Sequence, residues 1–151
     1  MSGNSYIELK KTYAPYPKSK IVEWDWHGIN IRKESQGPTK CEDSIQRKVI
    51  NELLNIEKYS IISDDDGSGE AADIVTIEET DHGSINIELY HCKYSSADLP
   101  GGRIDDLYDV CGQAQKSVHW MHSPIDIFKH LLKRNSHVLD GNPVYRYEKG
   151  T

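Results

Sequence analysis

A helical hydrophobic stripe followed by three strand-like runs constrains the fold of this chain more than any other feature. Across residues 44–56 the apolar side chains recur with the 3.6-residue spacing of an amphipathic helix. Apolar strand-like runs follow at 59–62, 72–77 and 84–94, and a second helical stretch covers 104–121. The order helix, strand, strand, strand, helix predicts an α/β or α+β sandwich.

Length and charge limit the class of protein. The 151 residues are enough for one ordinary domain, and three cysteines are too few for a secreted disulfide scaffold. No apolar run approaches the ~20 residues of a membrane helix, and the N-terminus lacks the apolar region of a signal peptide. We therefore expect a cytoplasmic protein without a membrane partner. A net charge of −6 argues against a protein that coats DNA nonspecifically, but it is compatible with a nucleic-acid enzyme.

Composition divides the chain into three zones. Residues 1–40 are expected to be an N-terminal extension with short strands at 21–26 and 29–32. Residues 41–122 hold the core pattern. Residues 123–151 predict a helix, with proline at its first position, and a strand, both packed on the core. The last run stops without a natural tail, so we expect a fragment of a longer protein.

The candidate catalytic residues lie where two predicted strands pair. Asp73 begins the strand that follows an acidic, glycine-rich loop at 64–70. A turn at His82-Gly83 makes this strand and the next a hairpin, which brings Asp73 close to His91 and Lys93. Alternation directs His91 and Lys93 to one face. A carboxylate that holds a hard cation, beside a lysine that orients water, is what metal-dependent phosphodiester cleavage requires.

The segments 69–75 and 87–93, with the polar helix 106–117, resemble the PD-(D/E)xK nuclease superfamily. The resemblance implies a restriction-endonuclease-like core, in which a central mixed sheet is flanked by helices. It also implies a metal-dependent DNA endonuclease of a prokaryotic restriction or defence system, using Mg²⁺ or Mn²⁺. The implied partners are DNA, a fused or associated helicase or ATPase domain, and in one arrangement a second copy of the chain.

The resemblance assigns roles residue by residue. Asp73 and His91 would bind the metal, and Lys93 would position and activate water. Gln113 and Lys116 would contact backbone phosphate, together with Ser117 on the same helical face.

His91 departs from the family pattern, which usually has Asp or Glu at this position. Imidazole is a poor ligand for Mg²⁺ but an acceptable one for Mn²⁺. Three interpretations remain open: a Mn²⁺-tolerant nuclease, a site completed by Glu70 or Glu88, or a degenerate module that docks DNA or protein. Lys93 as a solvated lysine at a strand end is the corresponding structural alternative.

The first helix should supply a further acid. We select Asp43, which helical spacing places beside Gln46 as a second nucleic-acid contact. Glu42 and Glu52 are rivals, and an N-cap role for Asp43 explains the same residue without catalysis.

Three other functions fit parts of the sequence: a calcium loop, a zinc site and a docking module. A calcium loop starting at Asp64 fails, because Val75 stands where the bidentate glutamate is needed. A zinc site lacks paired ligand spacing. A docking module would use the helix at 123–134 and an exposed platform of Trp24 and Trp26. The alternate positions of these two residues place them on one face of a strand, which favours core packing over base stacking. The candidate zinc ligands are Cys41, His91, Cys92, Cys111, His119 and His122.

Overall fold

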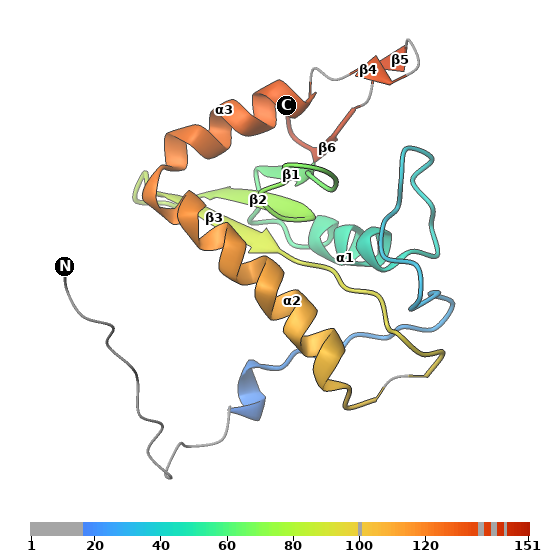
Figure 1. The fold of residues 1–151 in the computed structure, drawn as a ribbon. Helices are drawn as coiled ribbons and strands as arrows, with labels where there is room; N and C mark the ends of the chain where they lie inside the picture. The colour runs from blue at the N-terminus through green and yellow to red at the C-terminus, as the bar shows by residue number, and fades with distance from the viewer. Residues whose placement is uncertain (1–16, 100, 136–137, 140–141, 144) are drawn as a thin grey trace, which may run out of the picture.

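The computed structural model describes residues 17–99, 101–135, 138–139, 142–143 and 145–151, and it has a mixed α and β architecture (Figure 1). The core elements follow the expected order of helix, three strands and helix. In chain order the elements are η1 (Lys18–Lys20), α1 (Ile45–Leu54), β1 (Ile61–Asp64), β2 (Ile74–Glu79), β3 (Ile85–Tyr90), α2 (Ile104–Ser117), η2 (Val118–His122), α3 (Pro124–Asn135), β4 (Val138–Leu139), β5 (Asn142–Pro143) and β6 (Tyr147–Lys149).

The main sheet has the strand order β3-β2-β1-β6, and every neighbouring pair is antiparallel. The expectation of a mixed sheet is therefore wrong for the strands that the structure describes. The physical reason is the shortness of the links from β1 to β2 and from β2 to β3, since a parallel pair needs a crossover of a dozen or more residues. The hairpin register pairs Ile74 with Tyr90, which sets the neighbouring Asp73 beside His91.

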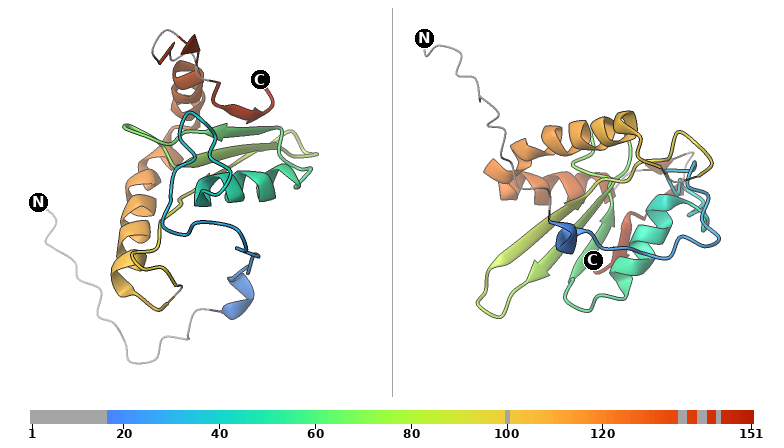
Figure 2. Two further views of the ribbon diagram at one scale, coloured as in Figure 1. Left: turned by 90° about the vertical axis from the view of Figure 1, so that its right-hand side faces the viewer. Right: turned by 90° about the horizontal axis from the view of Figure 1, so that it is seen from below.

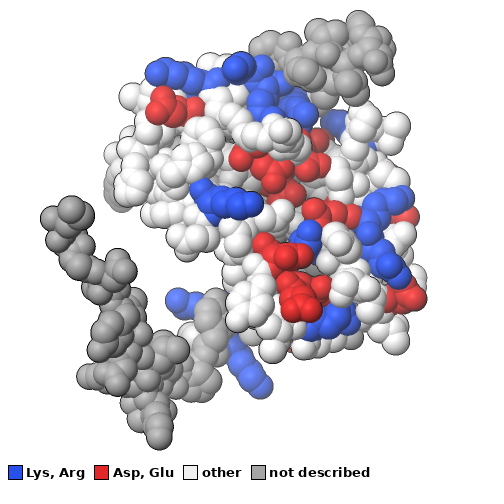
Figure 3. Space-filling model, viewed as in Figure 1, with Lys and Arg blue, Asp and Glu red and all other residues white. Residues whose placement is uncertain are grey.

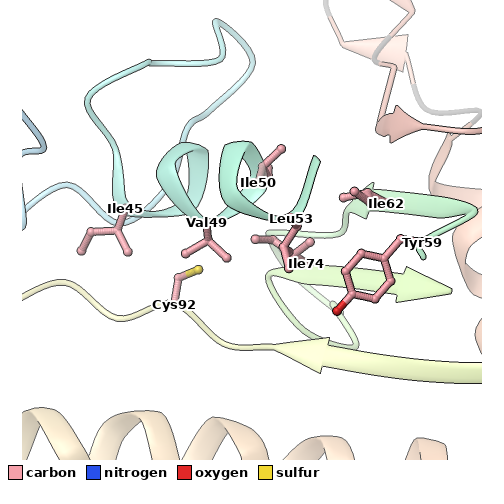
Figure 4. Close-up of a cluster of buried hydrophobic side chains, with 8 residues drawn as sticks. All are labelled: Ile45, Val49, Ile50, Leu53, Tyr59, Ile62, Ile74 and Cys92. Atoms are coloured by element: carbon pink, nitrogen blue, oxygen red, sulfur yellow. The ribbon is translucent and has the colours of Figure 1, made fainter. Parts of the chain in front are cut away.

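Helix α1 covers one face of the sheet because one stripe of its surface is apolar. Ser44 caps the helix by accepting a hydrogen bond from the Arg47 amide at 3.1 Å. Figure 4 shows the α1 side chains directed at the strands, with the Cys92 side chain pointing back at the helix. The buried cluster consists of Ile45, Val49, Ile50, Leu53, Tyr59, Ile62, Ile74 and Cys92.

The opposite face is covered by α3 (Figure 2). Ile127 and Leu131 of this helix are buried against Val75 and Ile77 of β2. Ile125 and Leu132 of the same helix remain exposed, so the packing of α3 uses only part of the apolar run that the docking-module alternative invokes. The chain then returns as β6, which pairs with β1.

The strands expected at 21–26 and 29–32 do not form, so the prediction of strands in the N-terminal extension is wrong. The described residues 17–40 contain a 3₁₀ helix and turns instead. The backbone bonds locally: the Ile21 amide donates to Lys18 O, and the Ile29 amide donates to Trp26 O through a turn that has Gly28 at φ 81°. Alternating side chains alone do not make a strand without a neighbouring edge to pair with.

Candidate metal centre

Asp73 lies immediately before β2, where the sheet, α1 and the loop 64–70 meet. The residue is only 3% exposed. Its Oδ2 atom accepts a hydrogen bond from the Cys92 amide at 2.9 Å, and its main-chain oxygen accepts one from Gln46 Nε2 at 3.1 Å. Oδ2 also lies 3.4 Å from Nδ1 of His91. The two residues meet as the hairpin predicts.

His91 is held in one tautomer by Ser117 at the end of α2. Its Nε2 atom lies 2.9 Å from Ser117 Oγ. The hydroxyl itself donates to carbonyl oxygens, Ala71 O at 2.5 Å or Gln113 O at 3.2 Å. A carbonyl cannot donate in return, so the hydroxyl oxygen must accept from His91, and the neutral ring carries its proton on Nε2.

The other ring nitrogen of His91 therefore presents a lone pair to a carboxylate. Nδ1 is buried without a hydrogen-bond partner among the described residues, and the side chain is only 8% exposed. Two acceptors at 3.4 Å repel each other unless a proton or a cation lies between them. A cation bound between His91 and Asp73 would remove this repulsion.

Two further carboxylates complete the cluster. In the described part of the chain, Asp66, Glu70 and Asp73 form the one group of three metal-binding side chains, with ligand atoms within 4.8 Å of one another. The loop fixes two of them: Ser35 Oγ donates to Asp66, and the Gly67 amide donates to Glu70 Oε2 at 2.6 Å. Of the two acids offered as alternatives, Glu70 joins Asp73.

The surroundings of this cluster disfavour the ionised form of its carboxyl groups. Burial, and to a lesser extent the charges of Glu70, Asp66 and Glu34, together raise the pKa of Asp73 to about 7, although the hydrogen bond from the Cys92 amide opposes the rise. Burial also raises the pKa of Glu70 and lowers that of His91. A bound divalent cation would reverse the penalty on the carboxylates, because it favours their ionised forms.

Lys93 lies next to this cluster but is not paired with Asp73. Its ammonium group is 3.4 Å from Glu34 Oε2 and 4.0 Å from Asp109 Oδ2, and the side chain is 20% exposed. Glu34 also accepts a hydrogen bond from the Tyr94 amide at 2.9 Å. Glu34 was missed by the sequence analysis, since nothing in its local pattern distinguishes it from a surface acid.

Asp43 lies outside the site. It precedes α1 rather than forming part of it, so the helical-face argument that aimed it with Gln46 does not hold. Lys33 donates to its Oδ1 at 2.8 Å and Cys41 does so at 3.0 Å, and these bonds lower its pKa. Its N-cap alternative is also wrong, because Ser44 caps the helix.

Gln46 is a structural brace rather than a nucleic-acid contact. It is 1% exposed. Its Nε2 donates to Asp64 Oδ1 at 2.9 Å as well as to Asp73 O, and its Oε1 accepts from the Gln36 amide at 2.8 Å. Both amide hydrogens are used inside the protein, so none remains for a phosphate.

The three residues of α2 that were expected to contact phosphate differ in their exposure to solvent. Lys116 is exposed, while Gln113 is half-buried and its Oε1 has no hydrogen-bond partner among the described residues. Ser117 is buried and serves His91. The three side chains therefore do not form one exposed phosphate-binding face.

The remaining alternatives do not gather at the cluster. Glu88 bonds to Lys58, Tyr59 and Tyr90. Glu42 pairs with Arg47, and Glu52 pairs with Lys48. The proposed zinc ligands form no group of three among the described residues, and Cys92 is buried toward α1, away from the Ser117 contact of His91.

No family model, curated protein or solved structure matches this chain. Within the described residues no helix is both long and apolar enough to span a membrane.

Proposed function

We propose that this chain is a divalent-metal-dependent nuclease domain that hydrolyses phosphodiester bonds in DNA. The observation that carries the proposal is the buried Nδ1 lone pair of His91, which faces Asp73 beside two further carboxylates. The element order of helix, three strands and helix also supports it, since the segments that resemble the PD-(D/E)xK superfamily lie on these elements.

The donor set fits a small, fairly hard cation. Asp66, Glu70 and Asp73 offer oxygen, which suits Mg²⁺ and Mn²⁺. His91 adds a nitrogen, which favours Mn²⁺ over Mg²⁺. The three carboxylates, whose ligand atoms lie within 4.8 Å of one another, would hold the ion. His91 would join them from beside Asp73, and its hydrogen bond with Ser117 leaves Nδ1 available for that contact.

The chain's own groups prepare the reaction in distinct ways. Bound at these residues, a divalent cation supplies charge that polarises a phosphate and lowers the pKa of a water molecule. Lys93 would hold a phosphate oxygen or orient the attacking water, and Glu34 restrains its ammonium group beside the cluster. Figure 3 shows acidic side chains gathered across the middle of one face with basic ones above them. Without the cation, this acidic centre would repel a nucleic-acid backbone.

The wider setting follows the same proposal. A domain of this kind would act within a longer prokaryotic protein of a cytoplasmic restriction or defence system, with a helicase or ATPase domain or a second copy of the chain as partner.

Supercoiled plasmid cleavage tests the proposal directly. We expect conversion to nicked or linear DNA with Mn²⁺, slower conversion with Mg²⁺, and none with EDTA. His91→Ala should lower the Mn²⁺-dependent rate by about 100-fold or more, and Glu88→Gln is the matched control that should leave it unchanged. If the purified wild-type chain binds Mn²⁺ but leaves DNA and RNA intact, the nuclease assignment is wrong.

That last outcome would favour the second candidate, a degenerate docking module. One observation supports it: Lys93 pairs with Glu34 rather than with Asp73. Such a module would bind DNA without cleaving it with either ion.

A further inference from the structure

A cavity of about 340 Å³ opens beside the candidate metal centre and shares two of its residues. One wall carries Trp24 and Trp26, another carries Val49 of α1, and the third carries His91 and Lys93. Figure 2 shows the N-terminal segment passing alongside α1, which is how the tryptophans reach this place from far away in the sequence. The volume lies within the ~300–1,000 Å³ typical of ligand pockets.

The two tryptophans play different parts in this wall. Trp24 is partly buried and packs against the core cluster under α1, so it serves the fold. Trp26 is 38% exposed although it is the largest apolar type of side chain. A turn fixes its backbone, since the Ile29 amide donates to Trp26 O at 3.1 Å. Trp26 is thus held in place by the fold without being used by the core.

The two tryptophan rings do not stack on each other. Their centroids are 6.3 Å apart and their planes are inclined by 38°, so neither ring covers the other face to face. An aromatic ligand can therefore stack on Trp26 within the cavity, as bases stack on aromatic side chains in sites for single-stranded nucleic acid.

The far wall of the cavity shows what such a ring would carry. His91 and Lys93 line this wall, and His91 also meets Asp73 of the metal centre, with its Nδ1 atom 3.4 Å from Oδ2. A ligand that spans the cavity has an aromatic ring at one end and an anionic group near Lys93 at the other. A nucleotide unit of a polynucleotide has this composition.

We propose that the cavity is a subsite for an unpaired nucleobase next to the phosphodiester that is cleaved. The inference rests on the proposed function and narrows its substrate to single-stranded DNA or to a duplex from which a base is extruded. In an intact duplex neighbouring bases cover both faces of each ring, so stacking on Trp26 requires an exposed base. A chain of net charge −6 has few cations to spare for gripping a duplex, and stacking supplies affinity without them.

Binding measured without cleavage tests the subsite. The full chain is titrated, with Ca²⁺ in place of Mn²⁺ so that the carboxylates hold a cation, into fluorescently labelled single-stranded thymidine oligomers, into the same oligomers with abasic positions, and into a matched duplex. Trp26→Leu keeps apolar bulk but removes the ring, Trp26→Phe keeps a ring, and Tyr108→Ala removes an exposed aromatic residue of α2 as a control. We expect a loss of about 10-fold in affinity for thymidine oligomers with Trp26→Leu, little loss with Trp26→Phe, and none with Tyr108→Ala.

The same measurements separate this inference from the nuclease proposal. Equal affinity of wild type and Trp26→Leu for thymidine oligomers, or equal affinity of wild type for intact and abasic oligomers, overturns the base subsite even if plasmid is cleaved. Failure of wild type to bind any oligomer overturns it as well. A Trp26-dependent preference for intact oligomers supports the subsite even if no cleavage occurs, in which case only the nuclease proposal falls.

Discussion

Nδ1 of His91 lies 3.4 Å from Oδ2 of Asp73 while the opposite nitrogen of the ring is committed to Ser117. Ser117 therefore acts as a positioning residue, because its hydroxyl decides which nitrogen carries the proton. This relationship links the end of α2 to the start of β2 through a single side chain.

Ser117→Ala should weaken Mn²⁺ binding by about 10-fold while leaving the fold intact, since loss of a hydrogen-bond partner behind a ligating histidine typically costs 10–100-fold. Ser117→Thr keeps the hydroxyl and should restore binding. Calorimetric titration with Mn²⁺ measures both, and thermal melting checks folding. Unchanged affinity in a folded Ser117→Ala variant would show that the tautomer of His91 has no part in metal binding.

The elevated pKa of Asp73 predicts a pH-dependent stability in metal-free protein. Its pKa is about 7 in the folded chain, whereas an ordinary aspartate carboxyl has a pKa of 3.8, and burial is the chief cause of the difference. The stabilisation from the protonated form is complete below pH 3.8 and is lost as pH rises through 7. Asp73→Asn cannot ionise, so from pH 4 to pH 8 it should gain on wild type by on the order of 2–4 kcal/mol in free energy of unfolding.

Urea denaturation in EDTA across this pH range measures the difference. Added Mn²⁺ should raise the stability of wild type at pH 8 and have a much smaller effect on Asp73→Asn. A constant difference between the two proteins from pH 4 to pH 8 would contradict the raised pKa.

Glu70 and Glu88 should respond in opposite ways to removal of charge. Glu70→Gln should lower Mn²⁺ affinity, because Glu70 belongs to the acidic cluster. Glu88→Gln should leave metal affinity unchanged but reduce stability above pH 4.5. Burial favours a higher pKa at Glu88, but hydrogen bonds from Lys58, Tyr90 and Tyr59 outweigh it and lower the pKa to about 2.

The sign for Glu88 is opposite to that for Asp73. Its stabilisation is present above the usual pKa of 4.5 and is lost as pH falls toward 2. Wild type should therefore lose its advantage over Glu88→Gln between pH 4.5 and pH 2, as followed by circular dichroism. If Glu88→Gln instead loses Mn²⁺ binding and Glu70→Gln does not, the two residues have been assigned the wrong way round.

The hairpin was the part of the site that sequence could predict. Strand pairing and side-chain alternation are local rules, and they suffice to bring Asp73 to His91 and to send Cys92 to the opposite face. The antiparallel direction of the pairs β1–β2 and β2–β3 was equally implied by their short links, although the resemblance favoured a mixed sheet. The pairing of β6 with β1 joins strands that are far apart in the sequence, and no short link implied it.

The residues that sequence analysis missed come from other segments. Glu34 reaches the site only through tertiary packing. Asp66 belongs to the acidic loop 64–70 before Asp73, but no periodicity distinguishes it from the other acids of that loop. Gln46 shows the reverse error: its polar type suggested a nucleic-acid contact, but a polar residue on the inner face of α1 is there to satisfy buried groups of the loop and β2. Ser117 was grouped with phosphate contacts because helical spacing cannot distinguish a buried face from an exposed one.

Replacement of His91 by glutamate should change the preferred ion. The variant exchanges a nitrogen for oxygen, so the Mg²⁺-supported rate should rise relative to the Mn²⁺-supported rate by about 10-fold. Wild type should also lose activity as pH falls through the pKa of His91, which burial lowers below the ordinary 6.5, because a protonated ring cannot bind metal. Initial plasmid-cleavage rates with each ion measure both effects. An unchanged ratio of rates would mean that His91 does not touch the ion.

Lys93→Ala should abolish cleavage without abolishing metal binding. The lysine is close to the acidic cluster but ion-paired with Glu34 and Asp109, so its loss removes transition-state charge rather than a ligand. We expect the rate to fall by about 100-fold or more, with Mn²⁺ affinity within about 3-fold of wild type.

Lys58→Ala provides the matched control for Lys93. Lys58 is also ion-paired with two acids, Glu78 and Glu88, but these lie away from the acidic cluster. Both variants should lose similar, small amounts of stability, about 1 kcal/mol or less, because partly exposed ion pairs contribute little. Only the Lys93 variant should lose activity. Equal activity of the two variants in single-turnover cleavage would remove Lys93 from the mechanism and leave the buried Asp73 and His91 pair as a metal site without a nuclease lysine.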